Sequence, residues 1–164
     1  MPAADEQTLY RIEDAVETQL VDIINDATSL GSSKIMRWLD SKDGLVSPRV
    51  EVEVQLGAPK GKHKHAASGY LRHDHWEMTI LIRVITNHDD DSASTHHTVL
   101  GQVRAKMEDW QELSELLVAN LPYHRIGKMV WSANTNTIDP EARERVTEMT
   151  YDSAVEIRSD AWPV

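Results

Sequence analysis

Histidines and aspartates gather at both ends of one apolar stretch of this chain. His73 and His75 open the segment HDHWEMTILIRVITNHDDD, and His88 with Asp89–Asp91 closes it. His96 and His97 follow shortly after. Imidazole nitrogens and carboxylate oxygens are ligands that zinc takes in hydrolytic enzymes. These residue types therefore raise the question of a metal site.

The spacing of these residues argues against a single metal site. The alternation of apolar and polar residues predicts one long strand, whose ends lie tens of ångströms apart at about 3.3 Å per residue. Only His88, Asp89–Asp91, His96 and His97 could meet locally, and their spacing matches no zinc-hydrolase or deaminase motif. The segment is better interpreted as a solvated strand face followed by a polar turn. A histidine-dependent metal hydrolase is the distant alternative, and a pH-sensitive role for His96 and His97 stays open.

Other catalytic signatures are missing from the sequence. The chain has no cysteine, which excludes disulfides, thiolate ligands and a cysteine nucleophile. It contains no G-x-S-x-G, and the basic stretch GAPKGKHKH lacks the pattern of a nucleotide phosphate loop. The sequence therefore shows no catalytic signature, and the spacing of its histidines and acids disfavours a metal site. The basic stretch belongs to a predicted mobile loop over residues 58–69, with either a solvated or a contact role.

Length and charge narrow the class of protein. A chain of 164 residues suggests one domain over residues 1–164. The formal charge of −10 disfavours tight nucleic-acid binding through the general surface. The acidic N-terminal stretch MPAADEQTLY has no signal-peptide pattern, and no apolar run is long enough to span a bilayer.

The periodicity predicts an α+β fold, with an antiparallel sheet and helices packed on one face in the order α-β-β-α-β-β. Helical spacing of apolar residues indicates helices over 6–28, 95–109 and 110–119, the second capped by Ser94 or Thr95. His96 and His97 would then lie in a first helical turn, where the helix dipole favours the neutral imidazole. Alternation indicates strands over 49–57, 70–87, 125–137 and 145–158, whereas 29–48 reads as irregular.

Four residues suggest a surface used by another subunit. Leu81 and Ile85 are apolar but share a strand face with Arg83, on the side expected to be wet. Apolar residues in such positions indicate a face that is partly covered. Trp162 lies in a terminal Trp-Pro segment that would dock on its own sheet or on a neighbour. We expect Leu81, Arg83, Ile85 and Trp162 to contribute to inter-subunit contact.

The central and C-terminal segments resemble the tail terminator proteins of long-tailed bacteriophages. The resemblance covers residues 70–162 and rests on the strand WEMTILIRVITN, the helix THHTVLGQVRAKM, the stretch LPYHRIGKMVWSANTNTID and the closing strand YDSAVEIRSDAWP. None of these segments is a catalytic signature. The N-terminal helix and first strand agree with the family only by their order.

The resemblance implies a structural role in the virion, at the head-proximal end of the tail, after assembly in the host cytoplasm. Proteins of this family form a hexameric ring on the tail tube, stop its polymerisation and offer a surface to the head connector. They are not enzymes and need no cofactor or membrane. DNA passes through the ring, and an acidic lumen would not grip it. The loop residues Lys60, Lys62, His63, Lys64 and His65 are candidates for contact with the tube or lumen. A head-tail connector or head-completion protein is the alternative.

Overall fold

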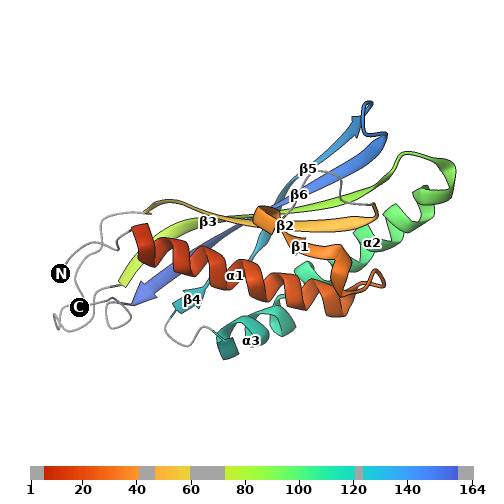
Figure 1. Cartoon of the computed structure of the whole chain (residues 1–164). Coiled ribbons are helices and arrows are strands. Elements are labelled where there is room, and N and C mark those ends of the chain that lie inside the picture. Colours follow the sequence, from red (N-terminus) through yellow and green to blue (C-terminus); the bar gives the residue numbers. More distant parts are fainter. Residues whose placement is uncertain (1–5, 41–46, 60–72, 121–123, 159–164) are drawn as a thin grey trace.

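A computed structural model describes residues 6–40, 47–59, 73–120 and 124–158 (Figure 1). The fold is α+β, as predicted: helices cover one face of a six-stranded sheet. The elements are α1 (Glu6–Ala27), the 3-10 turn η1 (Ser32–Lys34), β1 (Ile35–Arg37), the 3-10 turn η2 (Trp38–Asp40), β2 (Arg49–Pro59), β3 (His73–Asn87), α2 (Asp90–Glu108), α3 (Trp110–Asn120), β4 (His124–Ile126), β5 (Val130–Asp139) and β6 (Glu144–Arg158).

The sheet has the order β1-β2-β3-β6-β4, and β5 also pairs with β6. The long strands β2, β3 and β6 pair antiparallel, so Val52, Ile82 and Met149 lie side by side across the sheet. Because side chains alternate along a strand, this register directs one set of apolar residues toward the helices. The predicted division of β2 and β3 into an apolar and a polar face is confirmed.

One cluster of buried residues fills the space between the sheet and the helices. Leu20 and Ile24 of α1 and Val99 and Val103 of α2 are each fully buried in it. They recur at steps of three or four, which places them on one stripe of each helix. Burial of these stripes holds α1 against β2 and α2 against β3.

Two predictions about the sheet are wrong in detail. Residues 35–37 lie in β1, inside the segment predicted as irregular, and β1 pairs parallel to β2, so the sheet is not wholly antiparallel. The predicted strand over 125–137 is two strands, β4 and β5, which pair with different parts of β6. Gly127 separates them: its N–H donates to the Ala154 carbonyl at 2.7 Å, and its own carbonyl accepts from Ser153 Oγ at 2.6 Å.

α2 begins at Asp90, five residues before the start that the sequence pattern predicts. Asp89, not Ser94 or Thr95, caps the helix: its carboxylate accepts the Ser92 N–H at 2.7 Å. Asp90 and Asp91 occupy the first turn, where the helix dipole favours negative charge. The aspartate run predicted as a polar turn is therefore the cap and first turn of α2.

Two carboxylates of α1 close part of the sheet edge at β2. Beyond β1, the Val54 N–H donates to Glu17 Oε2 at 3.0 Å, and the Leu56 N–H donates to Glu13 Oε1 at 2.7 Å. Glu17 is 4% exposed and also accepts from Arg37 Nε at 3.1 Å. Burial raises the pKa of Glu17, and the bonds from Val54 and Arg37 oppose that rise. These bonds satisfy donors that would otherwise invite another strand.

Candidate functional site

The metal-site hypothesis finds no support in the described part of the chain. His73 and His75 lie at the far end of β3, opposite Arg158 and Glu156 of β6, whereas His96 belongs to α2 at the other end. Within the described ranges, no three His, Asp or Glu side chains are placed to hold one ion. The same ranges contain no helix with the length and apolar character of a membrane span.

His96 is a buried link between α2 and the sheet. It is 1% exposed, and its two ring nitrogens reach hydroxyls on different strands. Thr86 Oγ1 of β3 lies 2.9 Å from Nδ1, and Thr147 Oγ1 of β6 lies 2.7 Å from Nε2. Thr147 Oγ1 in turn donates to Asn136 Oδ1 of β5 at 2.8 Å. One chain of hydrogen bonds therefore joins β3, α2, β6 and β5.

The direction of this chain assigns the tautomer of His96. Since the Thr147 hydroxyl gives its proton to Asn136, its oxygen must accept from His96, so Nε2 carries the hydrogen. Nδ1 is then an acceptor, and the Thr86 hydroxyl donates to it. The neutral imidazole satisfies every bond of the chain.

Burial, and after it the positive charges of Arg145 and His97, together lower the pKa of His96 from 6.5 to about 4. The predicted neutral state is thus confirmed for His96, but its predicted cause is wrong. Because α2 begins at Asp90, His96 lies in the second turn, and burial outweighs any effect of the helix dipole. His97 is exposed.

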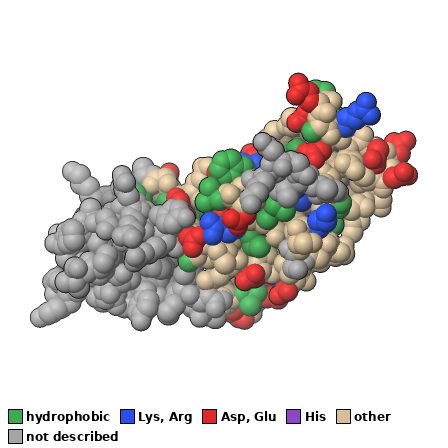
Figure 2. Space-filling model, viewed as in Figure 1, with side chains coloured by type: hydrophobic (Ala, Val, Ile, Leu, Met, Phe, Trp, Pro, Cys, Tyr) green, Lys and Arg blue, Asp and Glu red, His purple; other side chains and the backbone are tan. Residues whose placement is uncertain are grey.

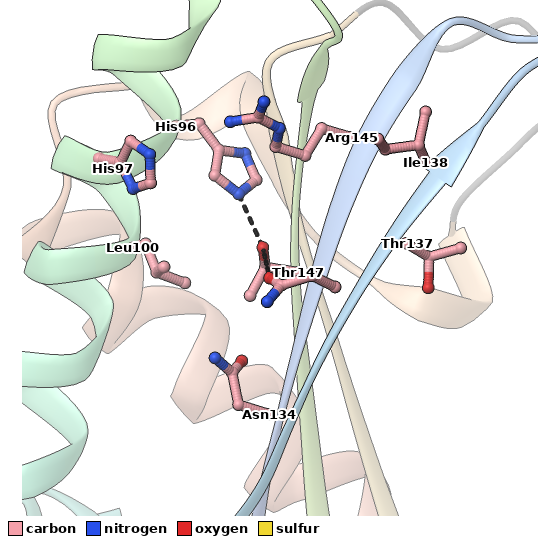
Figure 3. A pocket seen from close by; sticks show the side chains of 9 residues that line it. His96, His97, Leu100, Asn134, Thr137, Ile138, Arg145 and Thr147 are labelled. Atoms are coloured by element: carbon pink, nitrogen blue, oxygen red, sulfur yellow. Dashed lines mark hydrogen bonds between the residues drawn. The ribbon is translucent and has the colours of Figure 1, made fainter.

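An open groove of about 530 Å³ lies beside His96, between α2 and the strands β5 and β6 (Figure 3). Leu100 points into it from α2, and Asn134 faces it from β5. Among the described residues no Asp or Glu lines this groove, although the chain has 27 acidic residues. The lining residues are His96, His97, Leu100, Asn134, Asn136, Thr137, Ile138, Arg145 and Thr147.

β5 forms one wall of the groove and is exposed along its whole length. Three of its large apolar side chains are about half exposed: Val130 at 54%, Trp131 at 46% and Ile138 at 52%. The Arg104 guanidinium of α2 lies over the Trp131 ring, 5.1 Å from its centroid. Figure 1 shows the β5–β6 hairpin projecting away from the helices at one end of the sheet. These three side chains leave apolar surface of β5 open to solvent.

The opposite face of the sheet carries two ion-pair clusters. Arg83 Nη2 lies 2.9 Å from Glu53, and its Nε lies 2.7 Å from Glu148. Burial alone would lower the pKa of Arg83, but the bonds to Glu53 and Glu148 raise it above its usual value. Arg49 pairs in the same way with Glu51 and Glu144, at 3.0 and 2.9 Å. These clusters join β2, β3 and β6 within one chain.

The predicted contact residues meet different outcomes on this face. Leu81 and Arg83 are half-buried, whereas Ile85 is 3% exposed because its own chain covers it. The cover expected over Ile85 is supplied by its own chain, and a contact of these residues with another subunit stays a prediction. Lys60, Lys62, His63, Lys64, His65 and Trp162 lie outside the described residues.

The sequence interpretation missed the groove. Its walls come from α2 and from the β5–β6 hairpin, which no local pattern connects. One signal was available in β5, VWSANTNTID, where a tryptophan and an isoleucine flank a run of polar residues. Such a strand has little to bury on either face.

Comparison with known proteins gives little further guidance. No protein-family model matches the chain, and no curated protein matches it. One similar solved structure is a chain described as part of the virion of a native gene transfer agent particle. It is 13% identical, with a TM-score of 0.47, and the match covers 88% of this chain and 94% of that one. A likeness of this size does not carry a function from one protein to the other.

Proposed function

We propose that this chain is a structural protein of a bacteriophage-type virion and acts as a tail terminator. In this role identical copies form a ring at the head-proximal end of the tail tube. The ring stops tube polymerisation and provides the surface to which the head attaches. The carrying observation is β5, an edge strand exposed over all of its residues yet bearing three large apolar side chains.

The way in which β5 is held supports an assembly role. Its pairing with β6 and the bond from Thr147 to Asn136 fix its position before any partner arrives. A prepared surface loses less conformational entropy when it binds than a disordered one. The groove behind β5 has both apolar and polar side chains in its lining, as a protein-binding surface does.

The sequence resemblance supplies the identity of the assembly. It covers β3, α2, β4, β5 and β6, which include every element that lines the groove. The proposed ring, a hexamer by this resemblance, has the tail tube protein on one side and a head connector on the other. Its net charge of −10 fits a channel through which DNA slides without specific binding.

Contact with the tube is assigned to the basic loop with Lys60, Lys62, His63, Lys64 and His65. Contact between subunits includes Leu81, Arg83 and Trp162, in addition to the groove. Both assignments are part of the proposal.

The direct biochemical test is the addition of purified protein to polymerising tail tube protein. A terminator shortens the tubes seen by electron microscopy and caps one end of each. A double substitution of Trp131 and Ile138 by Ser should abolish this effect without unfolding the chain, because both side chains are about half exposed. The matched control is Leu116→Ser, an exposed leucine of α3 away from the groove.

A head-tail connector would give another result. It would leave tube length unchanged and bind finished tails or heads instead. Unchanged tubes together with binding to heads would therefore overturn termination in favour of the connector role.

A further inference from the structure

The turn η2 combines exposed apolar side chains with a carboxylate, whereas no carboxylate lines the groove among the described residues. Trp38 is 45% exposed and Leu39 is 57% exposed, so two adjacent large apolar side chains face solvent. Asp40 follows them with a side chain 68% exposed. We call Trp38–Asp40 the knob; Figure 2 shows hydrophobic side chains gathered over this turn, near the centre of the view. The knob therefore offers two apolar groups and one carboxylate.

Asp40 is the outermost carboxylate around Arg37. Its oxygen lies 3.9 Å from Arg37 Nε, while Asp14 and Glu17 make closer contacts with the same guanidinium. The charge of Arg37 is therefore met without Asp40. The carboxylate of Asp40 stays free to pair elsewhere at little cost.

Arg145 is the complementary charge in the groove. Within the described residues it has no carboxylate partner, and no acid lines the groove around it. Leu100 and Ile138 supply apolar surface beside it. The chain carries a net charge of −10, yet this groove is lined by an arginine and by no described acid. Such a groove is complementary to an apolar segment that bears one negative charge.

The sheet places the knob and the groove at opposite edges. η2 follows β1, the first strand in the sheet order, whereas β5 lies beyond β6 at the other edge. A closed ring needs two different complementary surfaces on each copy. The α1 carboxylates occupy the β2 edge beyond β1. Among the described residues, the knob supplies exposed apolar side chains on that side.

We infer that the knob of one copy docks in the α2–β5 groove of the next copy. Trp38 and Leu39 pack against Leu100 and Ile138, and Asp40 pairs with Arg145. The contact repeats around the ring proposed above, on which this inference rests.

Cysteine cross-linking tests the contact directly, because the natural chain has no cysteine. A chain with both Leu39→Cys and Ile138→Cys should form, on mild oxidation, a ladder of covalent oligomers that extends beyond the dimer. Each single variant alone should stay monomeric on a denaturing gel, and an equal mixture of the two should give dimers.

The control pairs Leu39→Cys with Thr98→Cys. Thr98 is exposed on α2, but two residues along a helix turn about 200°, so it faces away from Leu100. This pair should give no ladder. A ladder that stops at dimers, dimers from either single variant, or equal ladders in test and control would overturn the inference.

Charge exchange tests the Asp40–Arg145 pair. Arg145→Asp and Asp40→Arg should each weaken assembly by roughly tenfold or more, and the double variant should restore it. Asp40→Arg combined with Lys128→Asp keeps the same net charge and should not restore assembly. Failure of the double variant to recover would contradict the pairing.

Mass measurement of the unoxidised protein separates the two proposals. If the unoxidised double-cysteine variant forms a ring but gives no ladder on oxidation, the docking is overturned and the proposed function still stands. A chain that stays monomeric at every concentration, even with tube protein present, counts against both.

Discussion

At the scale of single residues, His96 couples folding to pH. The unfolded chain takes up a proton near pH 6.5, but the folded chain does so only near pH 4. The folded state therefore loses stability as the pH falls through this window, by about 3 kcal/mol in total. We expect the free energy of unfolding, measured by denaturant titration from pH 8 to pH 4, to show this loss.

Substitution isolates the contribution of His96. His96→Gln removes the titrating group, so its unfolding free energy should change less over the same pH range. The control His97→Gln alters the exposed neighbour, whose charge is the smallest of the three causes of the lowered His96 pKa, and should change the slope much less. Equal slopes in the His96→Gln variant and the natural chain would refute the assignment.

Thr147 should matter as the middle of the hydrogen-bond chain. Thr147→Val keeps the side-chain shape but leaves His96 Nε2–H and Asn136 Oδ1 without their shared partner. We expect a loss of about 1–3 kcal/mol in the free energy of unfolding, measured with denaturant at pH 7.5. Thr150→Val is the matched control on the other face of β6, and a loss as large as that of Thr147→Val would contradict this account.

The sequence could predict a neutral His96 but not the reason. Its burial depends on Thr86 and Thr147, which lie on two strands remote from each other in the chain. The Thr147 hydroxyl accepts from His96 and the Thr86 hydroxyl donates to it. This arrangement exists only when the folded sheet brings both strands next to α2.

At the scale of elements, the cap of α2 gives a clear prediction. Asp89→Ala removes the acceptor of the Ser92 N–H and should lower the melting temperature by about 2–4 °C. Ser94→Ala and Thr95→Ala, at the caps expected from sequence, should leave it nearly unchanged. Thermal unfolding followed by circular dichroism gives the melting temperature of each of the three variants. A larger decrease for Thr95→Ala than for Asp89→Ala would contradict Asp89 as the cap of α2.

The long elements could be predicted because each repeats its pattern many times. β3 spans fifteen residues and α1 spans twenty-two, so the alternation of one and the helical apolar spacing of the other each recur several times. β1 spans only three residues, which are too few for an alternating pattern to be recognised in the sequence. Its position in the sheet is set by its pairing with β2. The break between β4 and β5 follows from the close approach of Gly127 to Ala154, where an added Cβ would lie 3.3 Å from the carbonyl oxygen.

At the scale of the whole molecule, the basic segment with Lys60–His65, predicted as a loop from the sequence, should act in assembly rather than in folding. Removal of Lys60–His65 should leave a folded chain, judged by its melting temperature, but weaken its binding to tube or ring. Co-sedimentation with tail tubes measures that binding. A deletion of equal length within the acidic segment 1–7 serves as a control, and unchanged assembly by the loop deletion would rule out this role.

The groove could not be predicted at this scale because it belongs to no single segment. Leu100 and Ile138 lie on a helix and a hairpin that the fold brings together, and Arg145 becomes notable only because no acid is among the described residues that line the groove. The knob lies in the segment 29–48, which the sequence pattern predicts only as irregular. The exposure of Trp38 and Leu39, on which the proposed docking depends, could be learned only from the structure.

The most direct test of the central claim is tail length in lysates of a phage that lacks this gene, measured by electron microscopy. The tail-terminator account predicts overlong or open-ended tubes, with length restored when the gene is supplied in trans. Tails of normal length without heads would contradict termination and favour the connector role. Intact infectious particles would contradict a structural role in the virion altogether.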